Sequence, residues 1–228
     1  MEKTIIITGG SDGLGKALAT DLARDNRVII ISNDETRTRE AATELGCEYY
    51  SADVRDYGRI DWIISDILAK HERIDVLVNN AGIYIDGELT ENDSARIADV
   101  IGVNLTGVIN CSKSVIPSMK NNKSGLIINI NSQGGIIAKP ERAAYYASKW
   151  GITGFTRCLQ QEVSKYGIKV TDVMPGLMHT NLFDSAKTSR DMSTSMDTSE
   201  VARVVRFIIE TPEGVTIPEI GIKSIGYT

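Results

Sequence analysis

The stretch TIIITGGSDGLG, residues 4–15, joins a short apolar run to a glycine-rich turn, and leucines at helical spacing follow it. Glycines allow a tight turn in which a phosphate group can approach the backbone. The N-terminus of a helix after such a turn offers unpaired N–H groups and a favourable dipole to an anion. The stretch therefore predicts a strand, a phosphate-binding turn and a helix, with a plain tight turn as the alternative interpretation.

The same alternation continues along the chain, with short β-branched runs between longer amphipathic segments. Strands buried on both faces read as continuous apolar runs, and a repeated strand–helix–strand order implies parallel pairing. We expect strands at residues 4–8, 27–32, 48–51, 76–78, 126–130 and 169–173. We expect helices at residues 14–24, 38–45, 60–70, 93–120, 144–166 and 200–209, the last with Ser199 as its N-cap. The predicted fold class is α/β, a Rossmann-type doubly wound parallel sheet with helices on both faces.

Length, composition and charge bound the function classes. The chain has 228 residues, of which 42% are hydrophobic and 24% charged, and its formal net charge is −5. These values predict one packed domain over residues 1–228. The negative net charge does not favour binding to nucleic acid. No apolar stretch approaches the ~20 residues of a membrane span, and the N-terminus lacks a secretory signal. With three separated cysteines and two histidines, we expect a cytoplasmic protein with reduced thiols and no metal.

Residues 181–199 form a long segment without a regular pattern, rich in Ser, Thr, Asp and Met. Long irregular segments in compact domains are usually functional or disordered. We interpret this segment as a substrate-binding lid. A merely solvated connection between two elements is the alternative interpretation.

Tyr145 and Lys149 are four residues apart in a predicted helix, so they share one helix face. A phenol with a reference pKa of ~10 is a poor base at neutral pH, but a nearby ammonium stabilises the phenolate. The pair is therefore a candidate general acid/base. An ordinary Tyr and Lys on a helix face is the alternative for an isolated pair. Ser132, at the end of a predicted strand, favours the catalytic interpretation because ligands bind beyond the carboxyl ends of parallel strands.

Six motifs occur in one order along residues 4–180. They are TGxxxGxG at residues 8–15, Asp53-Val54, Asn79-Asn80-Ala81-Gly82, Asn104, Ser132 with the YxxxK pair Tyr145 and Lys149, and Pro175-Gly176 with Thr180. Each motif is common alone, but in this order they resemble the short-chain dehydrogenase/reductase family. One departure is Asn131, where many relatives carry serine; the catalytic position Ser132 is kept.

The resemblance implies roles for the catalytic residues. Tyr145 would exchange a proton with the substrate oxygen, and Ser132 would hold that oxygen. Lys149 would bind the nicotinamide ribose and lower the pKa of Tyr145, while Asn104 would hold a water that links Lys149 to solvent. The neighbouring Tyr146 is the competing tyrosine, but it lies only three residues before Lys149.

The resemblance also implies a cofactor site. In it, Asp53 would bind the adenine amino group, with Val54 packed beside the ring, and Thr180 would bind the nicotinamide carboxamide. The predicted cofactor-binding residues are Thr8, Gly9, Ser11, Gly13, Leu14, Gly15, Ser32, Asn33, Asp53, Val54, Asn80, Ala81, Gly82, Tyr145, Lys149, Pro175, Gly176 and Thr180.

The choice between NADP(H) and NAD(H) depends on residues near the end of the second predicted strand. Ser32 takes the position where NAD users carry aspartate and so permits a phosphate, which Arg37 or Arg39 could reach. Asp12 and Asp34 oppose a phosphate. We favour NADP(H), with NAD(H) as the alternative.

The predicted function is an NAD(P)-dependent oxidoreductase that interconverts a ketone and a secondary alcohol by hydride transfer. The alternative is a nucleotide-sensing binding protein on the same fold, which has no need for Ser132, Tyr145 and Lys149 together. The expected partners are a small-molecule carbonyl or alcohol substrate, without nucleic acid or membrane. The resemblance further implies a homodimer or homotetramer formed through the helices near residues 93–120 and 145–166.

Overall fold

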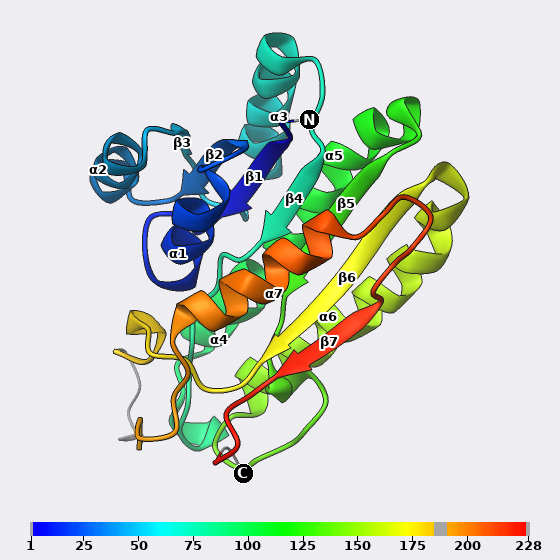
Figure 1. Ribbon diagram of the computed structural model, residues 1–228. Helices are drawn as coiled ribbons and strands as arrows, with labels where there is room; N and C mark the ends of the chain where they lie inside the picture. Colours follow the sequence, from blue (N-terminus) through cyan, green and yellow to red (C-terminus); the bar gives the residue numbers. More distant parts are fainter. Residues whose placement is uncertain (1, 185–190, 227–228) are drawn as a thin grey trace.

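The computed structural model describes residues 2–184 and 191–226 (Figure 1). Within these residues, seven parallel strands form one sheet in the order β3-β2-β1-β4-β5-β6-β7. Their bounds are β1 Thr4–Thr8, β2 Arg27–Ser32, β3 Glu48–Ser51, β4 Val76–Asn79, β5 Gly125–Ile130, β6 Ile168–Pro175 and β7 Glu219–Ile222. The predicted α/β fold with a doubly wound parallel sheet is therefore confirmed.

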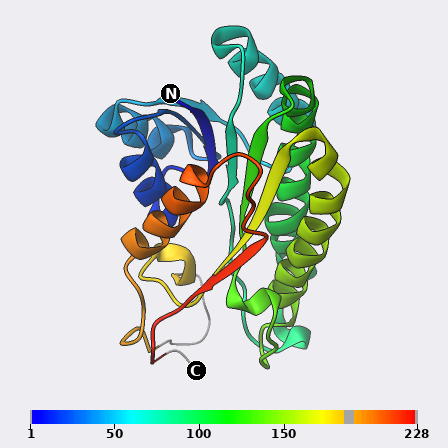
Figure 2. The same cartoon turned by 45° about the vertical axis from the view of Figure 1, so that its right-hand side comes forward.

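Helices cover both faces of this sheet. Their bounds are α1 Gly13–Leu22, α2 Glu35–Leu45, α3 Tyr57–His71, α4 Ser94–Ile101, α5 Gly107–Asn122, α6 Ala143–Val163 and α7 Thr198–Glu210. Figures 1 and 2 show α7 beside α1 on one side of the sheet, with α5 and α6 on the other. None of the helices in the described part of the chain is long and apolar enough to cross a membrane.

The strands are apolar throughout because each face has its own buried core. Ile5 and Ile7 of β1 pack with α1, α2 and α7, whereas Ile6 between them packs with α3 and α5. All three isoleucines are fully buried. Successive side chains of a strand point to opposite faces, so one continuous run serves both cores.

The order of the strands fixes where a ligand can bind. From β1 the chain winds outward to β2 and β3, and then returns to place β4 on the other side of β1. The carboxyl ends of β1 and β4 thus diverge at a switch point, where the following loops leave a crevice.

Three details differ from the sequence prediction. The helix expected over residues 93–120 is interrupted by a π-helical turn, Gly102–Thr106. Ser199 is not the N-cap of the last helix: Asp197 is, because its Oδ1 accepts a hydrogen bond from Ser199 N at 2.8 Å. The prediction also missed β7, whose residues alternate between exposed and half-buried at the edge of the sheet.

Candidate active site

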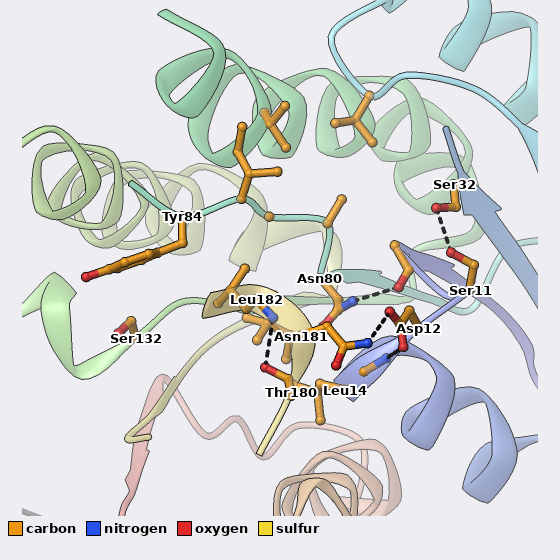
Figure 3. Close-up of a pocket in the computed structure, with 18 of the residues that line it drawn as sticks. Ser11, Asp12, Leu14, Ser32, Asn80, Tyr84, Ser132, Thr180, Asn181 and Leu182 are labelled. Carbon is orange, nitrogen blue, oxygen red and sulfur yellow. Dashed lines mark hydrogen bonds between the residues drawn. The ribbon is translucent and has the colours of Figure 1, made fainter. Parts of the chain in front are cut away.

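A cleft of about 560 Å³ opens at the carboxyl ends of β1 and β4. This volume lies within the range of small-molecule and cofactor sites. Of the residues predicted for the site, all except Thr8, Gly15 and Asn104 line the cleft. Figure 3 shows Ser11, Ser32, Asn80, Tyr84 and Ser132 around it.

The glycine turn after β1 has a backbone that other residues do not readily adopt. Gly9 has φ +66° and Gly13 φ +51°, both in the left-handed region. A Cβ on Gly9 would lie 2.9 Å from Ala81 Cα, so the absence of a side chain lets the loop after β4 approach. A Cβ on Gly15 would lie 2.0 Å from the Gly9 carbonyl oxygen, so this glycine lets α1 begin directly against the turn. Such a cradle, open to the N-terminus of α1, fits the pyrophosphate of a dinucleotide.

Thr8 acts behind the cleft. Its Oγ1 accepts hydrogen bonds from Asn80 N at 3.0 Å and Ala81 N at 3.1 Å, and Asn80 Nδ2 donates to the Thr8 carbonyl oxygen at 3.0 Å. These bonds join the turns that follow β1 and β4, so Thr8 holds together the two loops that form the crevice.

The end of β2 carries the residues that bear on the choice of cofactor. Ser11 Oγ donates to Ser32 Oγ at 3.0 Å, and Ser32, Asn33 and Arg37 all line the cleft. Arg37 is also 3.5 Å from Asp34, the N-cap of α2. The cleft is thus lined by the hydroxyl residues Ser11, in the turn after β1, and Ser32, at the end of β2, and by Arg37 of α2.

Asp53 and Val54, which follow β3, also line the cleft. Both carboxylate oxygens of Asp53 accept hydrogen bonds from Arg55, the shortest at 2.6 Å. The Arg55 guanidinium holds the pKa of Asp53 below its ordinary value. Asp53 is therefore fixed as a carboxylate at the edge of the cleft, where an acceptor can face an adenine amino group.

Ser132, Tyr145 and Lys149 meet where β5 ends and α6 passes. Ser132 caps the short turn Gln133–Gly135 by accepting from Gly134 N at 3.0 Å, which leaves its hydroxyl proton available for donation. Lys149 Nζ lies 5.8 Å from the centre of the Tyr145 ring and donates to the Ile130 carbonyl oxygen at 3.1 Å. All three residues line the cleft, as the sequence predicted.

Lys149 is buried, with 6% of its surface exposed. Burial lowers the pKa of its ammonium group to about 8, and the carboxylate of Asp172 acts in the opposite direction. Above this pKa the ammonium loses its proton, so the positive charge beside Tyr145 is available at neutral pH and declines in mildly alkaline solution.

Asn104 lies in the π-helical turn and does not line the cleft. Its Oδ1 accepts from Ile83 N at 2.9 Å, and its Nδ2 donates to the Ile83 carbonyl oxygen at 3.0 Å and to Ser148 Oγ at 3.1 Å. The side chain thus ties α6 to the loop after β4. Single π turns are frequent at functional sites, and this one sets Asn104 against the floor of the cleft.

Residues 3–191 match the family model described as short chain dehydrogenase. The chain belongs to this family.

Individual members are similar over most of the chain. A carbonyl reductase family member 4 from Xenopus tropicalis is 36% identical, covering 93% of each chain. A 3-oxoacyl-[acyl-carrier-protein] reductase from Synechocystis is 34% identical, covering 93% of this chain and 91% of that one. The solved structure of ElxO with NADP bound is 30% identical, with a TM-score of 0.88 and 97% of each chain covered. The chain is thus an NAD(P)-dependent short-chain dehydrogenase/reductase acting on CH–OH groups.

In this short-chain dehydrogenase, an aromatic cluster covers the proposed catalytic tyrosine. The ring of Tyr84, only 2% exposed, stands edge-on to Tyr145 at 4.8 Å between centres, and to Phe183 at 4.9 Å. Figure 3 shows Tyr84 on the same side of the cleft as Ser132. Sequence reasoning missed Tyr84 and the cleft-lining Arg96. The position of Tyr84, two residues beyond Gly82, could have indicated it.

The predicted lid contributes its first residues to the cleft. Asn181, Leu182, Phe183 and Asp184 line it, and Asn181 Nδ2 donates to Asp12 Oδ2 at 3.0 Å (Figure 3). Asp12 also caps α1. Residues 185–190 of the predicted lid lie outside the described residues, so its role as a lid stays a prediction.

Proposed function

We propose that this protein interconverts a ketone and a secondary alcohol, with Tyr145 as the general acid/base. The single observation that supports this proposal most is the shared cleft: Ser132, Tyr145 and Lys149 line the same space as the glycine turn. A protein that only senses a nucleotide has no need for these three groups at the end of the cofactor groove.

Each residue has a chemical role in this proposal. The Ser132 hydroxyl donates to the carbonyl oxygen and fixes the carbonyl plane. Tyr145 delivers its phenolic proton to that oxygen in reduction and removes the hydroxyl proton in oxidation. The Lys149 ammonium, 5.8 Å from the Tyr145 ring centre, stabilises the phenolate left behind. When bound, the nicotinamide supplies or takes up the hydride at the substrate carbon.

We further propose that NADP(H) is preferred to NAD(H). The hydroxyl groups of Ser11 and Ser32 form a hydrogen bond, and Arg37 lines the same cleft. Position 32 carries a serine and not a carboxylate that would repel a phosphate. Asp12, whose charge opposes a phosphate, accepts hydrogen bonds from Gly13 N and Asn181 Nδ2. The NADP bound in the ElxO structure supports the same choice.

The decisive experiment is a panel of small ketones and secondary alcohols, assayed in both directions with each cofactor. Tyr145→Phe should lower turnover by about 10²- to 10⁴-fold, because it removes the acid/base group. Calorimetry should show nucleotide binding unchanged.

The matched control is Tyr146→Phe. Tyr146 is the adjacent buried tyrosine, with its ring centre 6.0 Å from that of Tyr145, and its variant should keep turnover. Turnover at the wild-type rate in Tyr145→Phe would rule out Tyr145 as the general acid/base. Nucleotide binding without turnover on the whole panel would favour the sensing alternative.

We also propose that the chain forms a homodimer or homotetramer through α5 and α6. Trp150 of α6 is 51% exposed and Ile109 of α5 is 37% exposed. Large apolar side chains that stay exposed are enriched at interfaces. Light scattering should give a multiple of the 24.9 kDa chain mass; the mass of one chain contradicts this proposal.

A further inference from the structure

Arg96 of α4 lines the cleft, and the proposed reaction gives it no role. Among the described residues, the lysine and arginine side chains that line this cleft are those of Arg37, Arg96 and Lys149. Arg37 belongs to the side proposed for the ribose phosphate, and Lys149 serves the proposed acid/base. Arg96 is half-buried. A charge that is partly withdrawn from water is costly without a partner, so Arg96 calls for an explanation.

No carboxylate in the described part of the chain forms an ion pair with Arg96. On its own helix, Asp93 caps the N-terminus, and Asp99 pairs with Arg55. Among the described residues, the guanidinium makes one hydrogen bond, from Nη2 to the Tyr84 carbonyl oxygen at 3.4 Å, which is long. A guanidinium has five N–H donors, so most of them stay available for a ligand.

Tyr84 links Arg96 to the proposed catalytic tyrosine. Its carbonyl oxygen contacts Arg96, and its ring stands edge-on to Tyr145 with 4.8 Å between the ring centres. Ser132 lines the same cleft as these three residues, and Figure 3 shows it on the same side as Tyr84. One residue therefore separates the guanidinium from the place proposed for the reacting carbonyl, a span that a short substrate chain can cover.

The carboxylates of the cleft do not oppose an anion beside Arg96. They belong to Asp12, Asp53 and Asp184. Asp12 lies in the glycine turn and Asp53 after β3, and hydrogen bonds hold both of them there. Asp184 is exposed, where solvent screens its charge. The wall around Tyr84 is thus positively charged.

We propose that Arg96 binds a carboxylate of the substrate, so that the substrate class is an oxo acid and the corresponding hydroxy acid. This inference rests on the proposed function, which places the ketone at Ser132 and Tyr145. The planar fork of a guanidinium matches the two oxygens of a carboxylate. A phosphate brings nearly two charges, whereas Arg142, the other arginine that faces Tyr84, does not line the cleft.

The test compares oxo acids with their methyl esters, which keep the ketone but remove the negative charge. The probes are linear six-carbon acids with the ketone at the third, fourth or fifth carbon, assayed with each nucleotide. In the wild type, kcat/KM for the best acid should exceed that for its ester about ten- to hundredfold, as expected for a hydrogen bond between charged groups.

Variants of Arg96 test the source of this preference. Arg96→Gln should lower kcat/KM for the acid about ten- to hundredfold and change that for the ester less than about threefold. Arg96→Lys keeps the charge without the planar fork, so it should retain part of the preference. Arg203→Gln is the matched control, because Arg203 is exposed on α7, pairs with Glu200 and does not line the cleft.

Two results in Arg96→Gln overturn the inference. An equal loss for acid and ester would mean that Arg96 only supports the backbone at Tyr84. A weakened affinity for the nucleotide would assign Arg96 to the cofactor. Equal kcat/KM for acids and esters in the wild type overturns the inference as well.

Binding to nucleotide-loaded Tyr145→Phe separates this inference from the proposed reaction. Calorimetry should show that this variant binds the acid more tightly than the ester, because Arg96 is intact. The same comparison in the wild type decides the matter if no probe is turned over. Equal or absent binding of acid and ester rejects the role of Arg96, whereas full turnover in Tyr145→Phe rejects only the proposed acid/base.

Discussion

The cofactor side and the substrate side of the cleft are built by different means. On the proposed cofactor side, two glycines shape the turn after β1, and the Thr8 hydroxyl joins this turn to the backbone after β4 by accepting from Asn80 N and Ala81 N. On the side where we propose that the substrate binds, the wall includes the side chains of Tyr84 and Phe183, which meet edge-on. One side depends on the path of the backbone, and the other depends on which side chains its loops carry.

We infer from this difference that the cofactor side is general and the substrate side selective. A backbone cradle accepts any ligand with the right phosphate geometry, whereas an aromatic wall must match the shape of one substrate. One described hydrogen bond, from Asn181 to Asp12, joins the predicted lid to the glycine turn. Substitutions on each side should therefore have separable effects.

The largest of these effects should come from the glycine turn. Gly9 and Gly46 have nearly equal φ angles, +66° and +64°, but a Cβ would touch Ala81 at the first and nothing within 4 Å at the second. Each alanine variant should lose about 1–2 kcal/mol for the left-handed backbone. Gly9→Ala should lose about 1–3 kcal/mol more through overpacking.

Urea denaturation and nucleotide calorimetry measure these differences. Gly9→Ala should also bind nucleotide about tenfold more weakly, a loss of about 1.4 kcal/mol, while Gly46→Ala binds normally. If both variants lose the same stability and bind nucleotide as the wild type does, the glycine turn does not form the phosphate-binding site.

A smaller effect should come from the end of β2. Ser32→Asp puts a carboxylate beside the site proposed for the ribose phosphate, and like charges repel there. The ratio of KM for NADPH to KM for NADH should rise about ten- to hundredfold, because the carboxylate and the phosphate are two negative charges that solvent screens only in part. Ser51→Asp is the control. Ser51 of β3 pairs with Ser32 of β2 in the sheet but does not line the cleft. An unchanged ratio in Ser32→Asp argues against the NADP(H) proposal.

The smallest effect should come from the aromatic wall. Phe183→Ala removes an edge-on ring pair with Tyr84, which is worth about 0.5–1.5 kcal/mol. The KM for the carbonyl substrate should change about two- to tenfold, as that energy implies, while the dissociation constant of the nucleotide stays the same. Phe207→Ala, at an exposed ring of α7, is the control. A change in nucleotide affinity alone would contradict the separation of the two sides.

The sequence predicted the parts of the fold that depend on apolar runs and glycines. The bounds expected for β1, β2 and β3 agree with the structure because these strands are uninterrupted and end at polar or glycine residues. The strand Glu219–Ile222 was missed because an edge strand of four residues is only partly buried. Ser199 was predicted as the cap because the helix was expected to begin at residue 200, whereas it begins at Thr198 and is capped by Asp197.

Part of the candidate site was predictable from the sequence. Ser132, Tyr145 and Lys149 belong to motifs that occur in a fixed order along the chain. The contact between Tyr84 and Phe183 was not predictable, because it joins residues about a hundred positions apart and no local pattern indicates it. Asp172 was not predicted either, because it stands in the middle of a predicted strand and its hydrogen bond with Asn131 appears only in the folded structure.

The π-helical turn at Gly102–Thr106 makes the length of this segment as important as its composition. Gly107 N bonds to the Gly102 carbonyl oxygen, five residues back, so the turn holds one residue more than a regular helical turn. A chain with one residue deleted there could remain helical throughout, but α4 would rotate by about 100° against α5. Asn104 would then leave Ile83, and the loop after β4 would lose its support. Helix formation and cleft formation thus respond differently to the loss of one residue.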